Sequence, residues 1–161
     1  MGKVLSVFYN GFPGTVSRAV DQIIASFGNK ETENPIPFGG PVMLTSNGNG
    51  VLNFTTEIAS DQPTAARILG IAIRTSKTPD GYGESEGRYN PGDVTEVLTR
   101  GTCTVKVKSG IPHVGDKVYW TPEGFTPTYT EHQVCEITNM RWKSIADLNN
   151  HAEVVITDRS L

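Results

Sequence analysis

The histidines and cysteines are the side chains of this sequence that could perform acid–base, nucleophilic or metal chemistry. There are three histidines and two cysteines: His113, His132, His151, Cys103 and Cys135. No histidine has a cysteine or carboxylate at a spacing typical of metal ligands. Cys103 lies in a segment of alternating residue types, where a thiol is held in the wall of a sheet and is not displayed as a nucleophile. We therefore expect no metal site, no cofactor and no enzyme activity.

The two cysteines lie in or beside segments with strand character, where a small buried thiol is ordinary. We expect both to be buried free thiols, as in a protein made in a reducing compartment. A disulfide between Cys103 and Cys135 stays an open alternative.

A glycine-rich segment at residues 81–87 reads Gly-Tyr-Gly-Glu-Ser-Glu-Gly. It lacks the Lys-Ser/Thr ending of a phosphate-binding loop. Asp80, Glu84 and Glu86 could offer carboxylates to a calcium ion, but their spacing matches no EF-hand. A solvated acidic loop is the favoured interpretation.

Aromatic and arginine side chains accompany the same loop. Tyr82, Arg88 and Tyr89 belong to the residue types most enriched in interface hot spots, so we predict that they lie at a subunit interface. In the alternative, the tyrosines pack the loop onto their own sheet.

The N-terminus is apolar and aromatic up to Pro13 and Gly14. Such a terminus is usually tied down, either as an edge strand of its own domain or by strand addition to another subunit. In the second case, residues 1–14 are an arm and residues 15–161 are a single β domain. The arm residues expected to contact the partner are Val4, Leu5, Val7, Phe8, Tyr9 and Phe12.

The elements that must position these residues have the pattern of a β protein. Two apolar, β-branched segments at 68–74 and 94–108 flank the glycine-rich loop, and the second alternates with the period of a strand. Further strands are expected at residues 42–44, 51–54, 117–120, 125–130, 134–142 and 152–157. Short strands separated by Gly and Pro turns are typical of a sandwich or small barrel, so we predict an all-β fold.

At most two short helices are expected in this fold. A helix is predicted over residues 16–27, because Val16, Val20, Ile23, Ile24 and Phe27 recur at helical spacing. The alternative is a strand, since isoleucine and valine also suit a strand. The polar segment 57–67 is expected to be a surface loop with one helical turn at its two consecutive alanines.

Residues 30–40 contain closely spaced prolines, which exclude a helix and a central strand. An extended connector, pinned by the apolar side chains of Ile36 and Phe38, is expected there.

Length and charge limit the function classes. A chain of 161 residues with a net charge of −3 and no Lys/Arg cluster is expected to be one domain that does not bind nucleic acid directly. The sequence has no apolar run of about 18 residues and no apolar core of a signal peptide, so we expect a soluble protein that does not enter a membrane.

Short motifs follow one another in a fixed order along nearly the whole chain. They include Gly11-Phe12-Pro13-Gly14, Pro35-Ile36-Pro37-Phe38-Gly39, Leu69-Gly70-Ile71-Ala72-Ile73-Arg74, Lys77-Thr78-Pro79-Asp80, Val97-Leu98-Thr99-Arg100-Gly101 and Gly115-Asp116-Lys117-Val118-Tyr119. In their shared order they resemble the structural cement, or decoration, proteins of tailed bacteriophage capsids.

The resemblance implies a protein that binds the outer surface of an assembled icosahedral head. Its partners would be the major capsid protein and further copies of itself, as a homotrimer at threefold or quasi-threefold axes. By clamping neighbouring subunits it would stabilise the head against internal DNA pressure. It would be synthesised in the host cytoplasm and located on the virion.

A carbohydrate-binding β module on a virion or cell surface is the alternative. Tyr119, Trp120 and Tyr129 are the aromatic residues that could stack on a sugar in that case.

Overall fold

The computed structural model describes residues 10–17, 21–54, 64–75, 87–130 and 134–157. These residues form strands, turns and extended segments, and the predicted all-β fold is confirmed. The strands are β1 (Val16–Ser17), β2 (Ile23–Gly28), β3 (Ile36–Pro37), β4 (Pro41–Leu44), β5 (Val51–Asn53), β6 (Thr64–Ala66), β7 (Gly70–Ala72), β8 (Arg88–Tyr89), β9 (Val94–Lys106), β10 (Lys117–Thr121), β11 (Gly124–Thr126), β12 (Cys135–Trp142) and β13 (His151–Ile156). Within the described ranges, no helix is long and apolar enough to cross a membrane.

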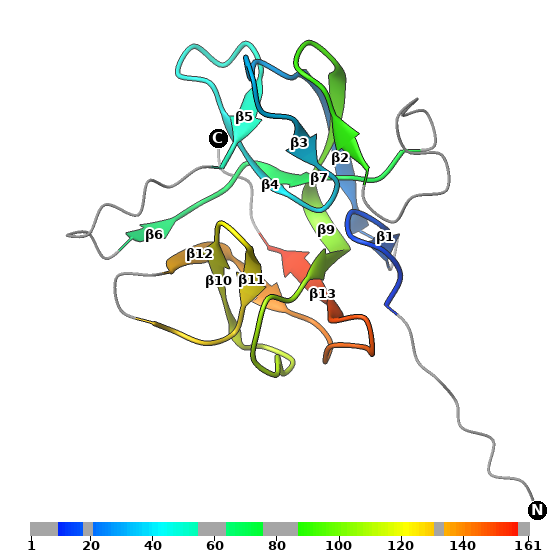
Figure 1. Cartoon of the computed structure of the whole chain (residues 1–161), viewed down its shortest axis with the longest axis vertical. Helices are drawn as coiled ribbons and strands as arrows, with labels where there is room; N and C mark the ends of the chain where they lie inside the picture. Colours follow the sequence, from blue (N-terminus) through cyan, green and yellow to red (C-terminus); the bar gives the residue numbers. More distant parts are fainter. Residues whose placement is uncertain (1–9, 18–20, 55–63, 76–86, 131–133, 158–161) are drawn as a thin grey trace, which may run out of the picture.

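The long strand β9 connects the two halves of the molecule (Figure 1). Its first half pairs with β2 and β7, and its second half pairs with β13 and β1. The partners change at Gly101, whose φ of 124° lies in a region that side chains other than glycine rarely adopt. The chain can therefore pass from one sheet region to the other without a break in the strand.

Two hydrophobic cores pack against β9: Val97 belongs to the upper one, and Leu98, Cys103 and Val105 belong to the lower one. The upper core in Figure 1, beside β4, β5 and β7, contains Ile36, Phe38, Val42, Val51, Leu69, Ala72, Tyr89 and Val97. The lower core lies between β9 and the strands β10–β13, and its largest fully buried side chains include Trp142, Phe125, Ile137 and Met140. Burial of each such side chain contributes about 1.5–3 kcal/mol.

Both cysteines are buried free thiols, as predicted. Cys103 lies in β9 and Cys135 begins β12, both in the lower core. Burial raises the pKa of the Cys103 thiol, and the nearby carboxylate of Glu153 raises it further. The thiol is therefore protonated and shielded from reagents.

The helix predicted over residues 16–27 is wrong. Residues 16–17 and 23–28 are strands, and both pair with β9. Exposure alternates along β2, with Ile24 and Ser26 exposed and their neighbours half-buried. The helical spacing of the valines and isoleucines was coincidental, because β-branched residues fit a pleated strand when a long partner is available.

The predicted helical turn at the alanines is wrong as well. Thr64–Ala66 forms β6, which runs parallel to β12 with Ala65 opposite Glu136. By contrast, the strands predicted at 42–44 and 51–54 are confirmed as β4 and β5, which pair antiparallel with each other. The connector at 30–40 is pinned by Ile36 and Phe38, both buried as predicted.

Candidate interaction surface

The base of the predicted N-terminal arm is fixed to the body of the protein at Asn10. Its backbone N–H donates to Asp147 Oδ2 at 2.8 Å. Its side-chain amide donates to the carbonyl oxygens of Ile145 at 3.0 Å and His151 at 2.7 Å. The hydroxyl of Thr104 donates to the Asn10 carbonyl. Asn10 is buried, and a buried polar residue with all these partners is held in one position.

Asp147 organises this anchor electrostatically. Its carboxylate accepts the backbone N–H groups of Asn10, Asn149 and His151 at 2.8, 2.8 and 3.0 Å. Burial tends to raise the pKa of the Asp147 carboxyl, but the backbone N–H donors of Asn10, His151 and Asn149 outweigh burial and hold the pKa below its ordinary value. Asp147 is therefore ionised at neutral pH and bonded to two separate parts of the chain.

The segment after Asn10 is also tied to the body. The carbonyl oxygen of Gly11 lies 2.8 Å from Nδ1 of His151. The Gly14 N–H donates to the Thr104 carbonyl at 2.9 Å, and the Arg74 N–H donates to the Gly14 carbonyl at 2.8 Å. Residues 10–14 thus form part of the folded body, whereas the rest of the predicted arm, residues 1–9, lies outside the described residues.

Phe12 is the one predicted arm contact that the structure describes, and it is exposed. Its ring lies 5.1 Å from the guanidinium carbon of Arg74, which lies 5.4 Å from the ring of Phe38 on the other side. The ring also meets His151 edge-on at 6.4 Å. Cation–π contact holds the aromatic side chain in place while leaving about half of it free for a partner. The other predicted contacts, Val4, Leu5, Val7, Phe8 and Tyr9, lie outside the described residues.

The predicted subunit-interface residues do not share one environment. Arg88 and Tyr89 are neighbours in β8, which pairs with β3, and their side chains point to opposite faces. Arg88 is exposed. Tyr89 is buried, with its hydroxyl donating to the Ile73 carbonyl at 2.7 Å and its ring 5.2 Å from that of Phe38.

Tyr89 therefore follows the alternative that the sequence left open, in which the tyrosine packs onto its own sheet. Arg88 keeps its place as a predicted interface residue. Tyr82 lies outside the described residues.

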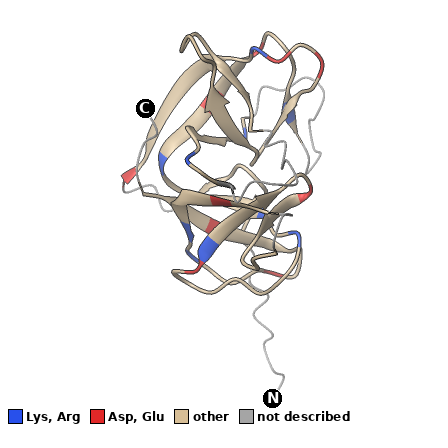
Figure 2. Cartoon of the chain, turned by 90° about the vertical axis from the view of Figure 1, so that its left-hand side faces the viewer, with Lys and Arg blue, Asp and Glu red and all other residues tan. Residues whose placement is uncertain are grey.

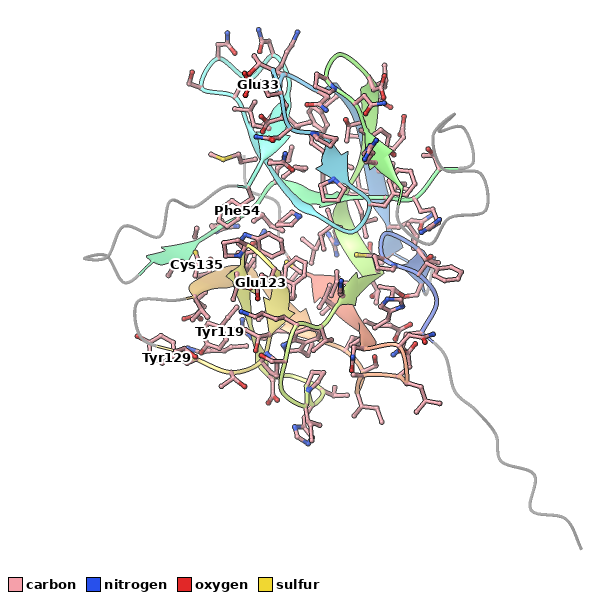
Figure 3. All side chains as sticks on the ribbon, in the orientation of Figure 1. Glu33, Phe54, Tyr119, Glu123, Tyr129 and Cys135 are labelled. Carbon is pink, nitrogen blue, oxygen red and sulfur yellow. The ribbon has the colours of Figure 1, made fainter. Side chains whose placement is uncertain are left out.

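The aromatic residues of the carbohydrate-binding alternative are split between two faces. Tyr119 and Tyr129 lie together with ring centroids 5.7 Å apart, as the labelled side chains in Figure 3 show. Trp120 follows Tyr119 in β10, so it points to the other face, where it meets Phe125 at 4.8 Å. Trp120 also lines a groove with Pro37, Gly40 and Pro122. The three residues therefore do not form one flat platform for a sugar.

The remaining candidates for chemistry are dispersed. His113 is exposed, with Nδ1 3.5 Å from Asp116 Oδ2, whereas His151 is used at the anchor and His132 lies outside the described residues. In the described part of the chain, no three His, Cys, Asp or Glu side chains are grouped so that they could hold a metal ion.

The anchor formed by Asn10, Asp147 and His151 was missed by the sequence analysis. No element is predicted for the segment 144–150, and Asn10 is 137 residues away from Asp147 in the chain. The one local signal is the Asp-x-Asn-Asn order at 147–150, typical of a turn in which the aspartate accepts nearby backbone N–H groups. That signal predicts the turn but not its distant partner.

Comparison with known proteins gives a family and a fold. Residues 6–157 match the family described as structural cement protein (E217 gp24/Pam3 gp6). No curated protein matches the chain. Among solved structures, a chain of "The capsid of Myoviridae Phage XM1" is similar with a TM-score of 0.71 at 19% identity, covering 98% of this chain and 97% of that one. At this identity the structural likeness supports the fold, and the family match covers nearly the whole chain.

Proposed function

Because the chain belongs to the structural cement protein family of phage capsids, we propose that it binds the outer surface of an assembled icosahedral head and joins neighbouring major capsid subunits. The observation that carries this proposal beyond the family is the anchor at Asn10. A protein that clamps a shell needs a contact segment whose attachment to the folded body does not move under load. The hydrogen bonds at Asn10 would provide that attachment.

The arm, residues 1–9, is the proposed contact segment. It contains Val4, Leu5, Val7, Phe8 and Tyr9, which suit an added strand at the edge of a partner's sheet. Fully extended, nine residues span roughly 30 Å, enough to reach across the edge of a neighbouring subunit. Backbone hydrogen bonds along the added strand would supply affinity, and alternate side chains would supply specificity.

The base of the arm determines whether binding can resist force. A pulling force on residues 1–9 is transmitted to Asn10. Asn10 is bonded to Asp147 and Ile145 in the β12–β13 connection, to His151 at the start of β13, and to Thr104 of β9. Strand β9 is the longest strand described and contacts both cores. Load on the arm therefore spreads into the most deeply embedded element of the protein.

Stabilisation of the shell follows from linkage. A ligand that binds only the assembled lattice shifts the equilibrium toward it, by about 2.7 kcal/mol per site at a concentration of one hundred times Kd. We propose that the protein acts as a trimer at threefold or quasi-threefold positions, because three tethered copies give avidity that one contact lacks. DNA pressure would then have to break all three contacts before capsomers part.

The test is co-sedimentation of the purified protein with undecorated shells, with bound copies counted per capsomer. Three forms are compared: the full chain, the chain lacking residues 1–9, and a quadruple variant Val4→Ser, Leu5→Ser, Val7→Ser, Phe8→Ser. Saturable binding by the full chain and loss of binding in the other two supports the proposal. A full chain that leaves every form of the shell bare refutes it, and glycan binding by that protein would favour the carbohydrate-binding alternative.

A further inference from the structure

Two connections lie at one end of the molecule, the lower end in Figure 1. Residues 107–116 join β9 to β10, and residues 143–150 join β12 to β13. The Val107 N–H donates to the Asn150 carbonyl at 2.7 Å and joins the two connections, and the Gly115 N–H donates to the carbonyl of Trp142, the last residue of β12, at 2.8 Å. The end is thus a built surface and not a pair of independent loops.

This surface presents four aliphatic side chains to solvent. Ile111 is 73% exposed, Val114 67%, Ile145 51% and Leu148 77%. Among the large hydrophobic side chains in the described ranges, three of these four are the most exposed. We refer to Ile111, Val114, Ile145 and Leu148 as the terminal patch.

Folding does not account for the terminal patch. A single exposed leucine is ordinary, and polar residues at such positions would leave both cores unchanged. Several exposed aliphatic side chains on the same end, bordered by polar residues, are typical of a surface that another protein covers. The patch therefore points to an interface.

The two connections differ in charge. The connection 107–116 carries Lys108, paired with Glu123 at 2.7 Å, and His113, whose Nδ1 lies 3.5 Å from Asp116, whereas the β12–β13 connection carries little charge. Figure 2 shows Lys, Arg, Asp and Glu distributed over the molecule. In the β12–β13 connection, Asp147 is the one acidic residue after Lys143, and it is buried with its carboxylate turned to backbone N–H groups. The exposed part of that connection from Ile145 to Asn150 hence carries no free charge, so covering it removes no ion from water.

The anchor connects the patch with the arm. The carbonyl of Ile145, a patch residue, accepts the Asn10 amide at 3.0 Å, and Leu148 follows Asp147, which accepts the Asn10 N–H. Asn10 is the residue that immediately follows residues 1–9, so the arm leaves the body beside the patch. A partner that takes up the arm meets the terminal patch at the same place.

We propose that the terminal patch docks on an apolar surface of the same major capsid subunit that takes up the arm. This inference rests on the proposed function and adds a second contact, made by the folded body, to the contact proposed for residues 1–9. Two contacts on one subunit fix the orientation of the protein on the shell, which an arm alone would not do.

The variant that tests it is Ile111→Ser, Val114→Ser, Ile145→Ser, Leu148→Ser. A matched control carries Ile24→Ser, Met43→Ser and Val94→Ser, which are exposed aliphatic positions on the upper strands β2, β4 and β9. Both variants keep the arm and the anchor. Because all the altered side chains are exposed, both are expected to unfold at about the temperature of the parent chain.

Binding to undecorated shells is measured by co-sedimentation, and self-association by sedimentation equilibrium. We expect the patch variant to lose about tenfold or more in affinity, with unchanged self-association, and the control to bind like the parent. Equal binding by parent and patch variant overturns the inference while the proposed function stands. Loss of self-association with retained shell binding overturns it in favour of a contact between copies. Failure of the parent itself to bind refutes the proposed function, and the inference falls with it.

Discussion

Replacement of Asp147 by asparagine tests the structural account of the anchor most sharply. The change keeps the size and shape of the side chain but turns one of its two acceptor oxygens into an NH₂ donor. Oδ2 accepts the N–H of Asn10, whereas Oδ1 accepts the N–H groups of Asn149 and His151. Whichever way the amide is placed, an NH₂ group faces a backbone N–H.

The expected loss of stability follows from the hydrogen bonds that the substitution removes. If the amide oxygen takes the place of Oδ1, the two local bonds survive and the bond to Asn10 is replaced by a donor–donor contact. A hydrogen bond to a charged acceptor contributes about 1.5–3 kcal/mol, and a buried donor left unsatisfied costs a similar amount. We expect Asp147→Asn to lower the free energy of unfolding by about 2–4 kcal/mol at pH 7.

The pH dependence gives an independent check. Because the folded pKa of Asp147 lies below its unfolded value, the stability it contributes is fully present above the unfolded pKa of about 3.9. It is lost as the pH falls through the folded pKa. The difference in unfolding free energy between parent and Asp147→Asn should therefore shrink at acid pH.

Urea denaturation of both proteins at a series of pH values measures this difference. A matched control is Asp116→Asn, whose carboxylate accepts the His113 N–H at 3.0 Å on the exposed surface and should change stability by less than about 1 kcal/mol. The reasoning is refuted if Asp147→Asn unfolds at the parent's urea concentration at pH 7, or if its deficit is the same at every pH.

Three further predictions concern other parts of the described structure. Gly14→Ala should lower the free energy of unfolding by at least about 2 kcal/mol, as measured by thermal or urea unfolding. The φ of Gly14 is +82°, and the new Cβ would lie 2.8 and 2.9 Å from two backbone nitrogens. A variant as stable as the parent would contradict this tight fit. Tyr89→Phe removes the hydrogen bond to the Ile73 carbonyl, so its free energy of unfolding should fall by about 1 kcal/mol while shell binding stays intact. Arg88→Ala should leave urea unfolding unchanged and weaken trimer formation in sedimentation equilibrium. The opposite pattern would reverse the roles of the two residues. Cys103 should resist alkylation at pH 8 in the folded protein and react in urea, as read by mass spectrometry, since burial raises its thiol pKa; rapid labelling of the native protein would contradict its position in the core.

The fold class could be predicted from the sequence because alternation is a local property. Residues 94–108 alternate and contain β9, and residues 134–142 contain β12. The same local logic failed at residues 16–27, where helical spacing of β-branched residues coincided with a strand. Pairing with β9 favours the strand over the helix at these residues. Because β9 lies far along the chain, the local sequence does not show this partner.

The interaction surface was less predictable for the same physical reason. The apolar character of the N-terminal residues was visible as composition, and Phe12, the one predicted contact within the described ranges, is exposed. The anchor depends on Asn10 meeting Asp147, a contact between residues 137 positions apart. Tyrosine and arginine are both common at interfaces, so residue type alone does not distinguish Tyr89 from Arg88. Their positions in β8 show that Arg88 faces solvent and Tyr89 is buried.

The measurement that tests the central claim most directly is a three-dimensional image reconstruction of shells to which the purified protein has been added. The account predicts ordered density on the outer face of the shell, with three copies around threefold or quasi-threefold positions. The lower end formed by residues 107–116 and 143–150 should face the capsid, and a strand of residues 1–9 should be added to a capsid subunit. Bare shells, density on the inner face, or the opposite end of the protein turned toward the capsid would contradict it.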